Sequence, residues 1–121
     1  MEFKSSKGIY LQIAERLCHK ILARDLLTGD RVVSVRELAM EIEVNRNTVM
    51  RAYSFLQQEG IFENKRGVGF FVAEGALEII KKKEKNLFFE VEIPQLLKKI
   101  RLLKLNSQDL ESIILEIKKH D

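Results

Sequence analysis

The chain has 121 residues, of which 45% are hydrophobic and 32% are charged. These proportions are typical of a soluble, folded, helix-rich protein, and the length suits one ordinary domain or a small domain with an appendage. The longest apolar runs are far shorter than the roughly 20 residues that a membrane span needs. The net charge of +3 is only mildly basic, so a nucleic-acid site must be argued from the local placement of cations.

Several kinds of chemistry lack support in the residues. Cys18 is the single cysteine, which excludes a disulfide framework and a Cys-rich zinc site. His19 and His120 have no partners at metal-ligand spacing. The sequence contains no P-loop, nucleophile elbow or paired carboxylates. We therefore expect no enzyme, no catalytic residue, no bound metal and no cofactor. Because no apolar segment follows the polar N-terminus, we expect a mature, cytoplasmic protein.

The first predicted helix covers residues 10–24. Its apolar residues recur at helical spacing and form a buried stripe: Tyr10, Ile13, Ala14, Leu17, Ile21 and Leu22. The turn Thr28-Gly29-Asp30 ends this pattern. The following residues 31–33 are predicted as a short strand beside a later hairpin.

Two further helices follow in close succession. Ser34 and Glu37 form an S-x-x-E capping box, which starts a helix that ends near Glu43. Asn45 is a favourable N-cap for the next helix. That helix is predicted to run to about Glu59 and to bury Val49, Ala52, Tyr53 and Leu56.

Residues 61–64 and 70–72 are short β-prone runs on either side of a glycine-rich, basic tip, Lys65-Arg66-Gly67-Val68-Gly69. The order helix, turn, helix, hairpin predicts a winged helix-turn-helix over residues 1–75, whose second helix would fit a DNA major groove. The predicted fold class is therefore mainly α with a small β-hairpin.

The helix 45–59 carries the sharpest functional pattern. Arg46, Asn47 and Arg51 face outward near its start, with Thr48 at the edge. Arginine can bond guanine O6 and N7, and asparagine can bond adenine in the same bidentate way. Arg36 lies at the start of the preceding helix, where a phosphate would dock. The alternative is an ordinary solvated helix face.

The tip of the hairpin has two interpretations as well. Glycines such as Gly67 would let the backbone approach a phosphate or the minor groove, while Lys65 and Arg66 supply charge. The alternative is a plain tight turn with solubilising charges. The later run Lys81-Lys82-Lys83 is interpreted as a solvated helix face rather than a second DNA site.

Residues 76–121 are predicted as a short helical dimerisation tail. Two or three short helices cannot bury this many large side chains alone, and exposing one such side chain costs about 1.5–3 kcal/mol. A symmetric dimer would cover them by helix packing. The residues expected in that interface are Leu77, Ile80, Leu87, Phe88, Val91, Leu97, Ile100, Leu103, Leu110, Ile113, Ile114 and Ile117. The alternative is a tail that folds back on its own winged helix. Pro94 is expected to kink or break the tail helix near Ile93.

Five ordered motifs within residues 9–72 resemble the GntR family of bacterial transcription regulators: Ile9-Tyr10-Leu11-Gln12-Ile13, Ser34-Val35-Arg36-Glu37-Leu38-Ala39, Asn45-Arg46-Asn47-Thr48-Val49-x-Arg51-Ala52-Tyr53, Leu56-x-x-Glu59-Gly60 and Gly67-x-Gly69-x-Phe71-Val72. The short tail, with Glu92-Ile93-Pro94 and Leu103-x-Leu105-x-Ser107, is similar to the YtrA subfamily, whose members pair through a small helical tail.

The resemblance implies that Arg36, Arg46, Thr48, Arg51 and Gly67 contact DNA. Two departures limit it. Val32-Val33 stand where the family often has Leu-Pro. Met50 stands where the fatty-acid-responsive branch has arginine.

The leading hypothesis is a homodimeric, sequence-specific DNA-binding regulator, a repressor that binds an inverted-repeat operator on double-stranded DNA. One alternative is a winged-helix adaptor that binds another protein. Another is a sensor gated by a small ligand at the dimer junction. The sequence identifies no effector and no target gene.

Overall fold

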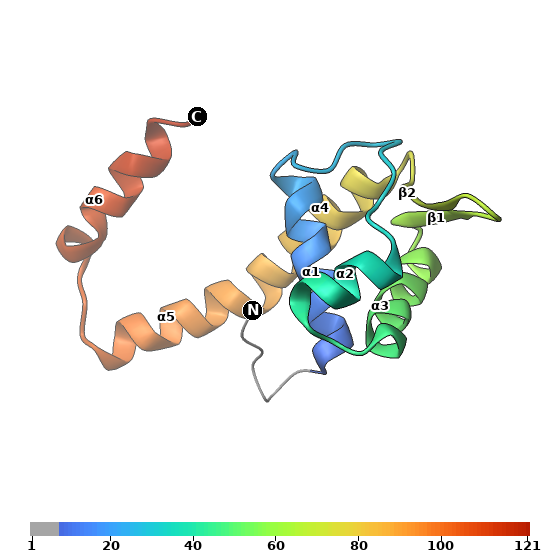
Figure 1. Ribbon diagram of the computed structural model, residues 1–121. Helices are drawn as coiled ribbons and strands as arrows, with labels where there is room; N and C mark the ends of the chain where they lie inside the picture. Colours follow the sequence, from blue (N-terminus) through green and yellow to red (C-terminus); the bar gives the residue numbers. More distant parts are fainter. Residues whose placement is uncertain (1–7) are drawn as a thin grey trace. The chain divides into compact units, whose positions relative to one another are not determined.

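The computed structural model describes residues 8–121 (Figure 1). Its elements in chain order are α1 (Ile9–Leu22), α2 (Val35–Ile42), α3 (Arg46–Gln58), β1 (Phe62–Lys65), β2 (Gly69–Val72), α4 (Ala76–Leu87), the π-helical turn η1 (Phe88–Glu92), α5 (Ile93–Leu102) and α6 (Ser107–Lys118). The chain divides into two compact units after Lys83. We call the described part of the first the winged-helix unit (residues 8–83) and the second the tail unit (residues 84–121). The expectation of a mature protein rests partly on the polar residues 1–7, which lie outside the described residues.

The winged-helix unit is built around α3, which packs against α1, α2 and β1. The four inward residues predicted for this helix, Val49, Ala52, Tyr53 and Leu56, are at most 1% exposed. They meet the buried side of α1, which includes Ile13. Apolar residues at this spacing form one continuous face, and burial of that face supplies most of the stability of a helix this short.

Tyr53 adds a directed bond to this core. Its hydroxyl donates to the carbonyl oxygen of Val33 at 2.6 Å, and its ring meets the rings of Phe62 and Phe70 edge to face. Burial, with smaller contributions from the carboxylates of Glu41 and Glu37, raises the pKa of Tyr53 far above its usual range. The phenol therefore stays neutral and ties α3 to the segment before α2.

The helix-turn-helix is set by local caps. The Ser34 hydroxyl oxygen accepts from the backbone N–H of Glu37 at 3.1 Å, and the hydroxyl donates to the Glu37 carboxylate. Asn45 Oδ1 accepts from the N–H of Asn47 at 2.7 Å, so Asn45 is the N-cap of α3 as predicted. Between the helices, Glu43 adopts the left-handed conformation with φ 56°. These interactions satisfy N–H groups that helix starts leave open and turn the chain sharply from α2 into α3.

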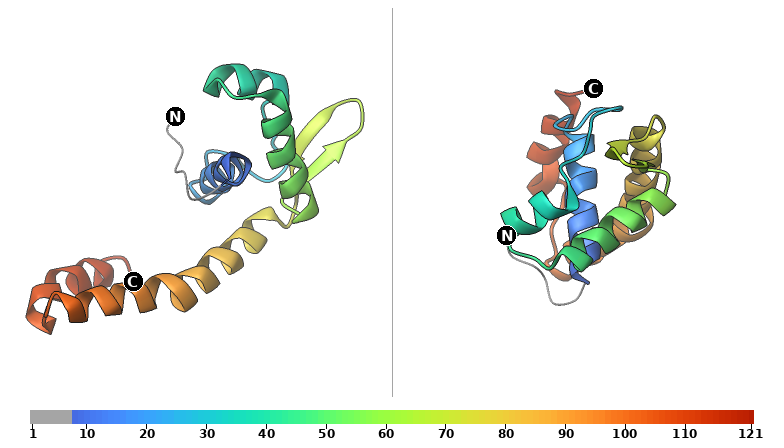
Figure 2. Two further views of the ribbon diagram at one scale, coloured as in Figure 1. Left: turned by 90° about the horizontal axis from the view of Figure 1, so that it is seen from below. Right: turned by 45° about the vertical axis from the view of Figure 1, so that its right-hand side comes forward.

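The two strands pair antiparallel, with Phe62 opposite Val72 and Lys65 opposite Gly69. The predicted third strand is present as a single bridge between Arg31 and Phe71, beside a hydrogen bond from the N–H of Val32 to the Phe70 carbonyl. Figure 2 shows the hairpin extending away from the end of α3. The tip therefore projects from the helices as a wing.

The first residues of α4 belong to the winged-helix unit. Ala76 and Ile80 of α4 are at most 2% exposed and belong to the core of the winged-helix unit, and Leu77 packs against that core. Lys83 also forms an ion pair with Glu59 near the end of α3. The first unit thus extends eight residues beyond the predicted limit at residue 75. Helical spacing identifies an apolar face but does not tell what covers it.

In the tail unit, Pro94 does not remove its predecessor from the helical region, because Ile93 has φ −63° and ψ −47°. The kink or break expected near Ile93 takes the form of the π-helical turn η1 instead. The wider turn shifts the carbonyls that a proline ring would otherwise meet. Further along, Asn106 and Asp109 form a reciprocal capping box that starts α6.

Candidate nucleic-acid interface

One side of α3 is polar and open over its first two turns. Arg46, Asn47 and Arg51 are exposed, and Thr48 is half-buried at the edge. Met50, which lies among them, is 40% exposed. The opposite side of the same helix is fully buried. The helix therefore presents two guanidinium groups and one amide outward from a rigid support, and these groups can bond base edges and phosphates.

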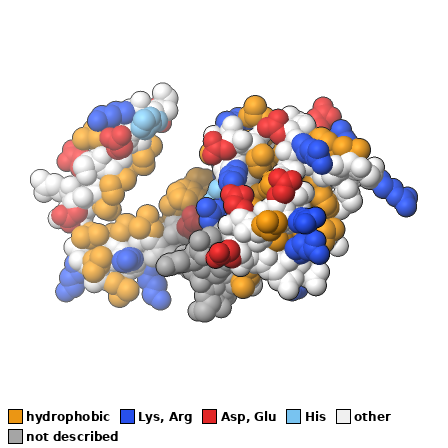
Figure 3. All heavy atoms as spheres, viewed as in Figure 1, with side chains coloured by type: hydrophobic (Ala, Val, Ile, Leu, Met, Phe, Trp, Pro, Cys, Tyr) orange, Lys and Arg blue, Asp and Glu red, His pale blue; other side chains and the backbone are white. Residues whose placement is uncertain are grey.

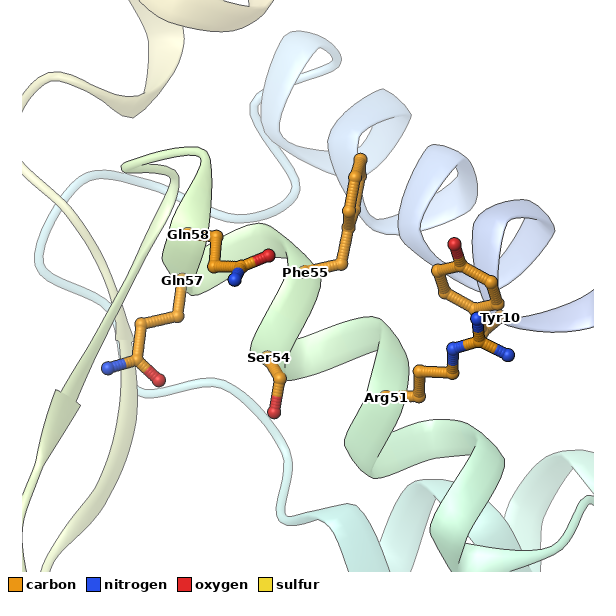
Figure 4. A pocket seen from close by; sticks show the side chains of 6 residues that line it. All are labelled: Tyr10, Arg51, Ser54, Phe55, Gln57 and Gln58. Carbon is orange, nitrogen blue, oxygen red and sulfur yellow. The ribbon is translucent and has the colours of Figure 1, made fainter.

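Arg51 lies over an aromatic ring of the neighbouring helix. Its guanidinium carbon is 3.9 Å from the centre of the Tyr10 ring on α1. The Tyr10 ring in turn meets Phe55 of α3 edge to face, at 6.1 Å between ring centres. Figure 4 shows these side chains lining an open groove of about 570 Å³ together with Ser54, Gln57 and Gln58. Arg51 is thus held at the rim of a groove between α1 and α3.

The wing tip is exposed at Lys65, Arg66 and Gly67. Gly67 has φ +78°, a backbone conformation that residues with side chains rarely adopt. The tight turn therefore itself favours glycine at this position. Lys65 Nζ lies 4.4 Å from the centre of the Phe71 ring on the paired strand. Figure 3 shows Lys and Arg side chains at the outer end of the hairpin. The tip therefore has the geometry of a tight turn, and it also exposes two cations that can bond a phosphate.

Arg31 braces the wing from the side. Its guanidinium donates to the carbonyl oxygen of Val68 at 2.8 Å. A side chain at Gly69 would meet Arg31 Nε at 3.3 Å, and Gly69 has φ +140°. Gly69 is therefore needed both for its backbone conformation and for the room that Arg31 occupies.

Arg36 is exposed in the first turn of α2, two residues after the Ser34 cap. Phosphate groups bind favourably near helix N-termini because backbone N–H groups and the helix dipole point toward them. Arg36 thus lies at the helix terminus where a phosphate contact is predicted from the sequence.

The tail unit exposes most of the side chains predicted for dimerisation. None of residues 84–121 is buried. Exposed fractions are 46% for Leu87, 44% for Phe88, 42% for Val91, 46% for Leu97, 59% for Leu103, 55% for Ile113, 50% for Ile114 and 56% for Ile117. Ile100 and Leu110 are half-buried. Figure 3 shows hydrophobic side chains in rows along α5 and α6. Of the other two predicted residues, Ile80 is buried in the core of the winged-helix unit and Leu77 is partly buried against that core.

Within residues 8–121, the acidic, His and Cys side chains form no group of three or more that could hold a metal ion. Over the same range, every helix is too short or too polar to cross a membrane.

Sequence reasoning missed the roles of Tyr10 and Arg31. Tyr10 was assigned to the buried stripe of α1, yet its ring is half-buried and lies beneath Arg51. Arg31 was assigned only to a short strand. Spacing along the chain gives no signal for either contact, because each joins residues of distant segments.

Residues 9–72 match the family described as bacterial regulatory proteins, gntR family. The chain belongs to the GntR family. A relative from Bacillus subtilis, the uncharacterized HTH-type transcriptional regulator YhcF, is 46% identical over 90 residues, which are 74% of this chain and 74% of that protein. The HTH-type transcriptional repressor YtrA from the same organism is 44% identical over 73 residues, which are 60% of this chain and 56% of that protein.

A solved GntR family transcriptional regulator from Listeria monocytogenes has the same fold. Its TM-score is 0.73 at 32% identity, over 97% of this chain and 98% of that one. These matches confirm the predicted winged-helix fold and the resemblance to YtrA. They also confirm that this GntR protein is a DNA-binding transcriptional regulator and not an enzyme.

Proposed function

We propose that this GntR regulator is a homodimeric repressor that acts in the cytoplasm on an inverted-repeat operator. Two copies pair through their tail units. Their two α3 helices then enter successive major grooves about 34–36 Å apart.

The proposal of a dimer rests on the exposure of the apolar side chains in the tail unit. None of its residues is buried, while Leu102 is 71% exposed and Leu103 is 59% exposed. Large apolar side chains left in water cost about 1.5–3 kcal/mol each relative to burial. A second copy offers an identical apolar surface, and a two-fold axis lets each surface cover the other.

The polar side of α3 supports reading of sequence. Arg46 and Asn47 stand exposed at the start of the helix, where a helix in the major groove meets base edges. Arg36 and the wing residues Lys65, Arg66 and Gly67 would set the register by bonding phosphates on either side. Thr48 and Arg51 complete the proposed DNA-contacting set. A winged helix that binds another protein would not need this combination of arginine forks and amide.

The repressor assignment draws support from YtrA, which is named a transcriptional repressor. A dimer bound within a promoter would compete with RNA polymerase for the same DNA.

Selection of bound fragments from a random pool of duplex DNA tests this proposal. We expect two half-sites in inverted orientation, with centres about 10–10.5 base pairs apart, and two chains in each complex. A single half-site with one bound chain would contradict the dimer. Failure to enrich any sequence at low salt would contradict direct operator binding and favour the protein adaptor.

The matched control is the double variant Arg46→Ala, Asn47→Ala, which removes two of the three outward groups without touching the buried side of α3. We expect it to enrich no sequence. Transcription in vitro from a promoter that carries the selected site then tests the direction of regulation. Fewer transcripts support repression, and more transcripts contradict it.

A further inference from the structure

The Tyr10–Arg51 pair joins the first helix of the unit to the outward side of α3. The guanidinium carbon of Arg51 lies 3.9 Å above the centre of the Tyr10 ring. Behind it, Phe55 meets the Tyr10 ring edge to face at 77° between planes. Figure 4 shows the Arg51 side chain reaching from α3 to the ring on α1. Arg51 of α3 therefore packs on a ring of α1, which itself contacts a second residue of α3.

The geometry of such a stack leaves the arginine able to bind. A guanidinium carries its N–H donors in its own plane, so stacking uses the flat face and leaves the donor edges available. A free arginine side chain has many rotamers and loses that freedom on binding. A guanidinium already held against a ring has less freedom to lose, which favours binding of a planar pair of acceptors.

Tyr10 differs from the core residues of its own helix. Ile13, Ala14 and Leu17 are at most 4% exposed, whereas Tyr10 is only half-buried and lines the open groove. Ser54 and Gln58 follow Arg51 along α3 and line the same groove. A residue that served the core alone would be covered on both faces of its ring.

We propose that Tyr10 is a positioning residue that holds Arg51 in the orientation that bonds duplex DNA. The proposal rests on the DNA-binding role of α3. The acceptors would be two phosphate oxygens or the O6 and N7 atoms of a guanine, which present the same spacing to an arginine fork.

The first test compares Tyr10→Leu with Tyr10→Phe, with the selected duplex and a random duplex as probes. Tyr10→Leu removes the aromatic face and should weaken binding about two- to fivefold. Tyr10→Phe keeps the face and should bind as the unmodified chain does. Weakening on the selected duplex alone identifies a base contact, and equal weakening on both identifies a phosphate contact. Equal loss in Tyr10→Phe and Tyr10→Leu would overturn the proposal, because the hydroxyl would then act by itself.

A double-mutant cycle separates positioning from general stability. In an Arg51→Ala background, Tyr10→Leu should cause no further loss of affinity. In an Arg46→Ala background, it should cause the same fold loss as in the unmodified chain. Equal losses in both backgrounds would show that Tyr10 acts through the fold alone and would overturn the proposal.

A spectroscopic measurement covers the case in which Tyr10→Leu does not fold. In the unmodified chain, NMR should show the Arg51 side-chain protons shifted upfield by the Tyr10 ring current, relative to those of Arg46. Equal shifts for the two arginines would overturn the proposal. This readout needs no DNA, so it stays informative if the unmodified chain binds no duplex, an outcome that would contradict the proposed function instead.

Discussion

The winged-helix unit closes a core from α1, α2, α3, α4 and the hairpin, whereas the tail unit leaves every one of its residues at least partly exposed. Both are helical and both are rich in large apolar residues. In the first, elements from distant parts of the chain cover one another, so the apolar side chains are buried within one molecule. In the second, three short helical segments share too little surface to do so. Apolar content alone therefore does not make a core, because the apolar side chains of the tail unit stay exposed within one chain.

The largest expected effect separates a core residue of the winged-helix unit from an exposed apolar residue of the tail unit. Leu56 is 1% exposed and Leu103 is 59% exposed. Leu56→Ala should lower the free energy of unfolding by about 2–5 kcal/mol, because it leaves a cavity, and this cost should not depend on protein concentration. Leu103→Ala should cost less, and its cost should change with concentration if a partner covers it. Chemical denaturation at two concentrations checks both. A cost at Leu103 that does not change with concentration would contradict burial of this residue by a second chain.

The next effect concerns assembly. Ile113 and Ile117 of α6 are 55% and 56% exposed. The double variant Ile113→Asp, Ile117→Asp should prevent pairing, because burying unpaired carboxylates is costly, and the loss of bivalent binding should lower operator affinity about 100-fold or more. Sedimentation and binding titrations measure the two effects. Ser112→Asp, on the same exposed helix, is the matched control and should retain both properties. An intact dimer in the double variant would move the interface elsewhere.

Much of the winged-helix unit could be predicted because its signals are local. Ser34, Asn45 and Gly60 mark helix boundaries, and the structure places the ends of α2 and α3 within a residue or two of those expected. A cap acts on N–H groups two or three residues away, so the sequence itself contains both partners. The outward position of Arg46 follows from the same periodicity.

The missed features depend on contacts between distant segments. The bond from Arg31 to Val68 joins residues that are 37 positions apart in the chain. The stack of Arg51 on Tyr10 depends on how α1 and α3 pack against each other. Ile80 shows the same limit, because helical spacing indicates an apolar face and only the structure shows that the core of the winged-helix unit covers it. Local chemistry sets where elements begin and end, and packing sets what their faces meet.

A third prediction concerns base reading by α3. Arg46 is exposed in the first turn of the helix. Arg46→Ala should weaken binding to the selected operator by about 1–3 kcal/mol and relax preference at one base step. Competition titrations with operator and random duplexes measure the difference. An equal loss on both duplexes would leave Arg46 as a phosphate contact only.

A smaller effect tests the directed bond that Tyr53 makes in the core of the winged-helix unit. Tyr53→Phe removes the bond to the Val33 carbonyl and should lower the free energy of unfolding by about 1 kcal/mol. Because the folded state raises the pKa of Tyr53, its contribution is fully present below the unfolded pKa of about 10 and is lost as the pH rises above it. The difference between the unmodified chain and Tyr53→Phe in alkaline denaturation measures this. A difference that stays constant above pH 10 would contradict the coupling.

The smallest effect is expected at the wing. Lys65 is exposed at the tip and its ammonium lies over Phe71. Lys65→Ala should weaken binding to all duplexes alike and reduce the slope of log affinity against log salt by about one, because one fewer counterion is released.

Lys81 gives the matched control, since it is an exposed cation on α4 with the same charge. If only contact with phosphate matters, Lys81→Ala should leave the slope unchanged. If the two variants reduce the slope equally, the wing would act only through the overall positive charge of the unit. The ratio of the two slopes therefore decides whether the wing touches DNA, because long-range attraction depends on charge and not on which element carries it.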